Sequence, residues 1–198
     1  ASAVSHGIGA VLAAVALTSL VLRVIGRGDP QGLVAVSVYG LTLVALYLMS
    51  TLYHALTHPH AKRVFKLLDH AAIYLLIAGT YTAYALSILR GTLGWSLFGV
   101  IWACAGLGVA AEFTRLSRNR ALSAALYVMM GWLVVVVGGP AKAALSPVSF
   151  ALLVAGGLSY TFGAVVYALK RVPWTHPVWH LFVLAGSGLH FFSIWQSL

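Results

Sequence analysis

Residues 33–57 read LVAVSVYGLTLVALYLMSTLYHALT and contain no Asp, Glu, Lys or Arg. A helix of about 20 apolar residues crosses the roughly 30 Å hydrocarbon core of a bilayer, so this stretch is long enough to span a membrane. The rest of the chain is similar, since 61% of its 198 residues are hydrophobic, only 8% are charged and the mean hydropathy is +0.96. These values exclude an ordinary soluble domain and predict an all-α, polytopic membrane protein.

Six further apolar stretches are long enough to be helices and too long for the alternating strands of a barrel. The predicted spans are residues 3–25, 33–57, 67–89, 94–113, 121–138, 147–169 and 176–196. Breaks rich in Gly, Pro and polar residues separate them, as at 26–30, 58–60 and 138–140. We interpret the first stretch as a true span, because it lacks a basic leader and a cleavage site. No connection could hold a second domain, so residues 1–198 are expected to form a single seven-helix transmembrane bundle.

The distribution of Lys and Arg predicts the orientation of this bundle. With a cytoplasmic N-terminus, the cytoplasmic loops hold Lys62, Arg63, Lys66, Arg115, Arg118, Arg120, Lys170 and Arg171, whereas the outer loops hold Arg23, Arg27, Arg90 and Lys142. The positive-inside rule therefore favours a cytoplasmic N-terminus and an outside C-terminus. Anionic lipid head groups near these loops explain the net charge of +9. The chain offers no soluble basic face that would bind nucleic acid.

Four polar residues are expected to meet at the cytoplasmic side of this bundle. His54 lies near the end of the second span, Asp69 begins the third, and His176 and His180 begin the seventh. The last two are four residues apart, so they share one face of a helix about 6 Å apart. Three imidazole nitrogens suit zinc with an open fourth position, as in catalytic sites. The alternative interpretation is that these histidines form hydrogen bonds between helices.

Three motifs in this order resemble those of the bacterial hemolysin III proteins. They are Ser50-Thr51-Leu52-Tyr53-His54, Leu68-Asp69-His70 followed by AGTYT at 78–82, and His176-Pro177-Val178-Trp179-His180. That family is related to the progestin and adiponectin receptors, a group that also resembles alkaline ceramidases. The resemblance covers essentially the whole chain, including His6-Gly7-Ile8-Gly9 in the first span. Ala83 departs from the Pro of many relatives, and the acidic and Asn residues that often precede the first-span histidine are absent.

The resemblance implies a seven-helix bundle in the bacterial inner membrane with one zinc ion near the cytoplasmic leaflet. It implies His54, His176 and His180 as the ligands, with Asp69 contacting the metal-bound water and Ser50 beside it. Such a carboxylate can act as a general base. Ser50 lies one helical turn before His54, so its hydroxyl can orient water, substrate or ligand.

Two further histidines are candidates for supporting roles around the metal. His70 follows Asp69 but points about 100° away from it, so second-shell contact or interhelical packing is expected rather than ligation. His6 begins the first span at the same side, where a second-shell role and a plain interfacial role are both open.

His190 is expected roughly 15 Å deeper than His180, lining a cavity or bonding between helices. Glu112 is expected to form an interfacial ion pair with Arg115 at i+3.

Site chemistry and resemblance together predict a metal-dependent hydrolase that acts on the amide or ester bond of a membrane lipid. A pore-forming protein is one alternative, although a pore needs polar positions through the full thickness of the membrane. A receptor that senses a lipid without turnover is another, although very short outer loops argue against a large extracellular ligand. Membrane lipids are the expected partners, and no sequence feature indicates an oligomeric state.

Overall fold

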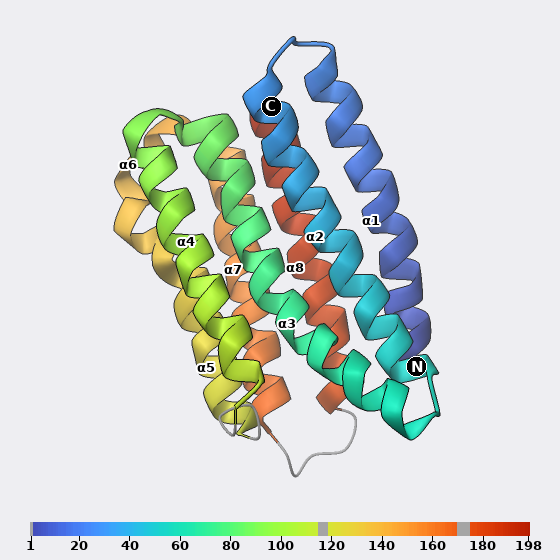
Figure 1. The fold of residues 1–198 in the computed structure, drawn as a ribbon. Coiled ribbons are helices and arrows are strands. Elements are labelled where there is room, and N and C mark those ends of the chain that lie inside the picture. The colour runs from blue at the N-terminus through green and yellow to red at the C-terminus, as the bar shows by residue number, and fades with distance from the viewer. Residues whose placement is uncertain (1, 115–118, 170–174) are drawn as a thin grey trace.

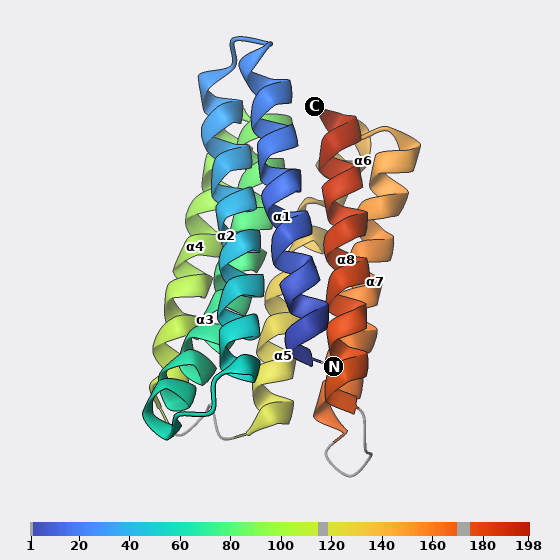
Figure 2. The same cartoon turned by 90° about the vertical axis from the view of Figure 1, so that its right-hand side faces the viewer.

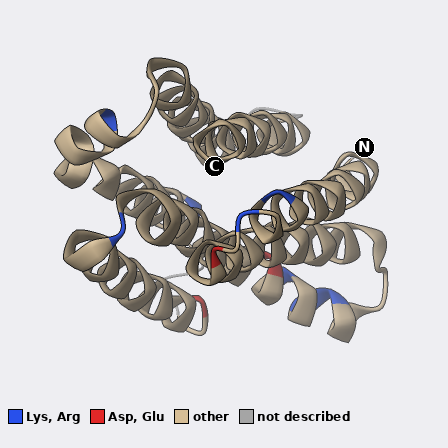
Figure 3. Ribbon diagram, turned by 90° about the horizontal axis from the view of Figure 1, so that it is seen from above, with Lys and Arg blue, Asp and Glu red and all other residues tan. Residues whose placement is uncertain are grey.

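The computed structural model describes residues 2–114, 119–169 and 175–198, and Figure 1 shows them as a bundle of helices. Within these ranges the chain contains no strand. Seven of its helical segments are long and apolar enough to cross a membrane. Figure 3 shows how few charged positions the ribbon carries. The predicted all-α, seven-span fold is therefore confirmed.

The helices follow one another with short turns between them. In chain order they are α1 (Ser2–Ile25), α2 (Pro30–Ala55), α3 (Pro59–Ala83) continued by the π-helix η1 (Tyr84–Leu89), α4 (Gly91–Glu112), α5 (Arg120–Gly131), the 3₁₀ segment η3 (Trp132–Val137), α6 (Gly138–Ala144), α7 (Pro147–Ala168) and α8 (Thr175–Ser197). Asp29 and Ser146 cap α2 and α7 by accepting hydrogen bonds from backbone N–H groups. Pro follows each of these caps, at a position where its missing N–H is harmless.

The third span begins earlier than the sequence predicted. Residues 59–66 belong to α3 and are not part of a loop, so the span runs over Pro59–Leu89. Pro59 occupies the first turn, and Lys62, Arg63 and Lys66 are exposed. These basic residues lower the local hydropathy without breaking a helix, which is why apolar length alone placed the start too late.

The fifth span differs from its predicted form, which ended at residue 138. The chain passes from α5 through η3 into α6 and stays helical to Ala144. Pro140 lies in the first turn of α6, where it causes no break. The Tyr81 hydroxyl of α3 accepts a hydrogen bond from Val134 N at 2.6 Å and donates one to Gly131 O at 2.7 Å. It thereby supplies partners to backbone groups beside the change of helix type, as an apolar environment requires.

The arrangement of the helices gives the bundle two distinct ends. In Figures 1 and 2, α2 ends and α8 begins at the lower end, which we call the metal end; the α1–α2 turn and α6 lie at the upper, far end. Helix α8 packs against α7 and α1, and α2 packs against α1 and α3. The end of α2 and the start of α8 are therefore brought to one level, as the topology predicted.

Candidate metal centre

Three histidines from two helices meet at the metal end. His54 lies in the last turn of α2, while His176 and His180 lie on successive turns at the start of α8. The Nε2 atom of His176 is 2.9 Å from Nε2 of His54 and 3.1 Å from Nε2 of His180. One candidate ligand atom from each of the three lies within 4.8 Å of the other two. The convergence predicted from topology is thus present.

The contacts among these nitrogens favour a shared cation over hydrogen bonding. Nε2 of an imidazole carries either one hydrogen or one lone pair, so that of His176 cannot bond well to both neighbours at once. Ligand nitrogens about 2.0–2.1 Å from a tetrahedral zinc lie roughly 3.3 Å apart, which is close to the separations of 2.9 and 3.1 Å from His176 to its two neighbours. The three histidines are therefore close enough, and of the right donor chemistry, to hold a metal ion.

Ser50 and Asp69 lie in the wall of the cavity that reaches this cluster. Ser50 is one turn before His54 on α2, Asp69 is on α3, and both are buried. The Ser50 hydroxyl interacts with the Asp69 carboxylate. Both residues line the same cavity as His176 and His180. The site thus places a hydroxyl and a carboxylate beside the histidines.

His6 of α1 also belongs to this end of the bundle. Its ring is only 3% exposed and stacks on the ring of His180, with centroids 3.6 Å apart and an interplanar angle of 14°. The ring of Tyr47 meets His6 edge-on at 5.1 Å. The sequence left open whether His6 supports the site or lies at the membrane interface, and its buried ring contact with a candidate ligand favours support of the site.

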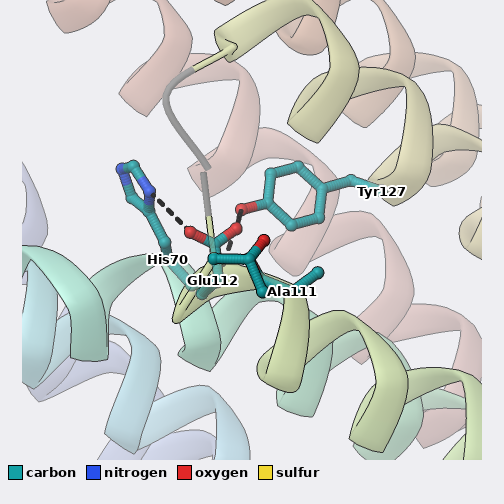
Figure 4. Close-up of polar contacts among 5 residues, drawn as sticks. His70, Ala111, Glu112 and Tyr127 are labelled. Atoms are coloured by element: carbon teal, nitrogen blue, oxygen red, sulfur yellow. Dashed lines mark hydrogen bonds and ion pairs between the residues drawn. The ribbon is translucent and has the colours of Figure 1, made fainter. Parts of the chain in front are cut away.

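His70 points toward the buried carboxylate of Glu112, as Figure 4 shows. Its Nδ1 is 3.4 Å from Oε2 of Glu112, and the hydroxyl of Tyr127 donates to Oε1 of Glu112 at 3.2 Å. The Glu112 side chain is only 2% exposed. His70 nevertheless lines the cavity together with Tyr127. It is therefore placed for a supporting role and not among the converging ligand atoms.

The Glu112 side chain is buried and does not extend toward solvent, as the expected interfacial ion pair would require. The last turn of α4 faces α3 and α5, so the carboxylate is buried between helices and bonds to His70 and Tyr127. Its expected partner, Arg115, lies outside the described residues. A carboxylate at the end of an apolar span is costly unless it is paired, which fits the interhelical bonds that Glu112 makes.

The cavity at the metal end continues toward the far end of the bundle. It has a volume of about 110 Å³ and adjoins a second cavity of about 470 Å³. Both are lined by Thr80, Tyr81, Gly131, Trp132, Gly157 and His190. Beyond these shared residues the second cavity is mostly apolar and includes Lys142. The polar site thus lies at one end of a mainly apolar internal space.

Buried polar side chains on α8 beyond His180 are bonded to neighbouring helices. Nε2 of His190 donates to Leu153 O at 3.1 Å, so its expected interhelical bond is present while its ring also lines the cavities. The Ser187 hydroxyl is 2.9 Å from the hydroxyl of Tyr47 and 2.8 Å from that of Tyr160. Ser193 donates to Ser149 O at 2.6 Å. The part of α8 beyond His180 therefore carries several buried polar groups, and each of them holds helices together.

Comparison with known proteins agrees with the fold and the motifs. The family described as "Haemolysin-III related" matches residues 1–191. The chain is 43% identical over 194 residues to Hemolysin-3 of Bacillus cereus, covering 98% of this chain and 89% of that protein. It is 40% identical to the Hemolysin-3 homolog of Bacillus subtilis (strain 168), covering 98% and 91%.

A more distant relative is the human monocyte to macrophage differentiation factor, which is 28% identical over 170 residues, covering 81% of this chain and 69% of that protein. No solved structure matches the chain. The family match extends over nearly the whole length and includes both segments that carry the converging histidines. With seven membrane-length helices as its framework, the chain belongs to the haemolysin-III-related family of membrane proteins.

Proposed function

We propose that this protein is a zinc-dependent hydrolase that cleaves an amide or ester bond of a membrane lipid. The observation that carries the proposal is the convergence of His54, His176 and His180 beside a cavity lined by Asp69 and Ser50. A donor set of neutral nitrogens without thiolates, on only three protein positions, suits a catalytic zinc more than a structural one.

The chemistry divides between the ion and the residues around it. Zinc held by the three histidines would polarise a carbonyl and lower the pKa of a bound water toward neutrality. Asp69 takes the proton of the attacking water and returns it to the departing amine or alkoxide. Ser50 orients the Asp69 carboxylate, with which its hydroxyl interacts. A nucleophilic role for Ser50 is disfavoured, because the neighbouring histidine on its helix is committed to the metal.

The shape of the internal space supports a lipid as the substrate. Polar groups lie at one end, and the adjoining 470 Å³ cavity is mostly apolar. A molecule with a polar head and an apolar tail matches that division. The chain also consists almost entirely of membrane-length helices, so a substrate dissolved in the bilayer has the most direct access. Membrane lipids are thus the partners that we propose.

Lipid hydrolysis by purified protein in liposomes tests this proposal. Zinc-loaded wild type should release fatty acid from at least one member of a panel of ceramides and phospholipids. Asp69→Asn should keep its zinc and lose about a hundredfold to ten-thousandfold in rate, because the amide cannot take the proton. His54→Ala should lose both zinc and activity. Asp29→Asn makes the same chemical change outside the site and should hydrolyse as fast as wild type.

Two results would contradict the hydrolase. One is the absence of zinc-dependent release across the panel, and the other is release by Asp69→Asn at the wild-type rate. Zinc binding with no turnover would favour a lipid sensor. A pore becomes the better account if liposomes show ion flux that survives removal of zinc. The structure argues against a polar channel along α8, because Ser187, His190 and Ser193 are hydrogen-bonded to neighbouring helices.

We further propose that the metal end faces the cytoplasm of a bacterial inner membrane. Lys62, Arg63, Lys66 and Arg120 are exposed on helices that begin at this end. The other basic residues counted at this side, Arg115, Arg118, Lys170 and Arg171, lie outside the described residues. In a Cys104→Ser background, His60→Cys should resist a membrane-impermeant thiol reagent in intact cells, whereas Lys142→Cys should react. The opposite pattern would place the metal end outside.

A further inference from the structure

The first helix brings a fourth histidine against the metal centre without supplying a ligand atom to it. The rings of His6 and His180 lie nearly parallel, with centroids 3.6 Å apart. An imidazole binds a metal through a ring nitrogen in the plane of its ring, whereas His6 presents the face of its ring to His180. His6 is therefore placed to support a candidate ligand and not to act as one.

The close approach of α1 that makes this stack is fixed by Gly9. A Cβ atom at Gly9 would lie 2.6 Å from Cδ1 of Tyr47 on α2 and 3.0 Å from Cδ2 of Leu184 on α8. Only a glycine therefore lets α1 lie this close to both neighbours. The ring of Tyr47 also contacts His6, nearly at right angles and with the ring centroids 5.1 Å apart. Figure 2 shows the start of α1 beside the lower part of α8.

His180 lacks the support that a metal-binding histidine usually has. Such a histidine normally donates its second ring N–H to a carboxylate, carbonyl or water, and this bond fixes the orientation of the ring. Among the described residues, Nδ1 of His180 has no partner at hydrogen-bond geometry, although the Ser2 backbone lies near it. The ring of His6, stacked on the face of the His180 ring, is thus placed to restrain the plane of that ring.

We propose that His6 is a positioning residue that holds the His180 ring in its metal-binding orientation by stacking. Its own Nδ1 and Nε2 have no partner at hydrogen-bond geometry among the described residues, although the His180 backbone lies near them, so the face of its ring is the contact that it offers to the His180 ring. This inference rests on the proposed zinc site and adds α1 to the helices that build it. The inference predicts that the site requires a flat ring at position 6 and does not require the nitrogen atoms of that ring.

Zinc dissociation from His6→Ala and His6→Phe, measured by chelator competition on purified protein, tests the proposal. His6→Ala should release zinc about 10–100-fold faster than wild type, as loss of an orienting contact does. His6→Phe keeps a flat ring and should stay close to wild type. Cobalt substitution gives a second readout, since the visible absorption bands should change in His6→Ala and be restored in His6→Phe. Leu20→Ala removes a buried α1 side chain far from the site and should lower thermal stability without changing zinc release.

The outcomes separate this inference from the zinc site on which it rests. A wild-type protein that binds no zinc would overturn both. Wild type and His6→Ala releasing zinc at the same rate would overturn only the positioning role. His6→Phe releasing zinc as fast as His6→Ala would show that the ring nitrogens are required, which contradicts support by stacking.

Discussion

The two ends of the bundle differ in how their polar groups are paired. At the far end, Asp29 accepts the Gly32 N–H and pairs with Arg90, so opposite charges and a helix start satisfy one another. At the metal end, three Nε2 atoms of like character crowd within hydrogen-bond distance and cannot all be paired. Polar groups at the far end thus satisfy one another, whereas the converging histidines have the spacing and the donor chemistry to hold a metal ion.

Of the changes that we consider, removal of the proposed zinc ion from the metal end should lower thermal stability the most. A ligand present at about a thousand times its Kd stabilises a folded protein by about 4 kcal/mol, so a strong chelator should lower the unfolding temperature of the detergent-solubilised protein clearly. The His176→Ala, His180→Ala double variant should unfold at the lower temperature with or without chelator. If the chelator lowered the unfolding temperature of the wild type and of the double variant equally, the proposed difference between the two ends would be contradicted.

The buried carboxylate of Glu112 at the metal end should matter more than the half-buried carboxylate of Asp29 at the far end. Glu112→Ala leaves His70 and Tyr127 without their shared acceptor and should lower the free energy of unfolding by about 1–3 kcal/mol. Glu112→Gln keeps an acceptor for Tyr127 and should cost less. Thermal unfolding at fixed zinc concentration measures both. If Glu112→Ala lowered the free energy of unfolding no more than Asp29→Asn does, burial of the carboxylate would not explain its contribution to stability.

The ion pair at the far end should give the smallest effect. The Gly32 N–H and the nearby Arg90 guanidinium hold the pKa of the Asp29 carboxyl below its ordinary value of 3.8. Asp29 therefore stabilises the folded state above the unfolded pKa, and this contribution is lost as the pH falls through the lower, folded pKa. Asp29→Asn still caps α2 and should cost less than about 1 kcal/mol. The difference from wild type should shrink in unfolding measurements between pH 5 and pH 3; a constant difference would exclude the ion pair as its source.

The helices and the meeting of the histidines could be predicted from the sequence because both follow from simple geometry. Apolar length gives each span, and alternation of direction brings the end of the second span to the same side as the start of the seventh. Residues 59–66 were missed because their basic side chains mask a helix that apolar length cannot detect. The 3₁₀ segment η3 depends on Tyr81 of another helix.

The supporting contacts of the site depend on neighbours that sequence spacing does not reveal. Nothing local to Glu112 names His70 as its partner, and nothing local to His6 shows that its ring lies flat on His180. Such contacts arise from how helices pack, here from the close approach that Gly9 allows. Candidate ligands were therefore accessible from the sequence, whereas the side chains that hold them in place required the structure.

Zinc stoichiometry of the purified protein tests the central claim most directly. Elemental analysis of wild type should find one zinc per chain, bound by His54, His176 and His180, and the His176→Ala, His180→Ala double variant should contain none. Glu112→Gln, which alters a polar group at the same end without touching a ligand, should keep its zinc. Full zinc occupancy in the double variant, or a wild type that binds none after incubation with excess zinc, would contradict the account.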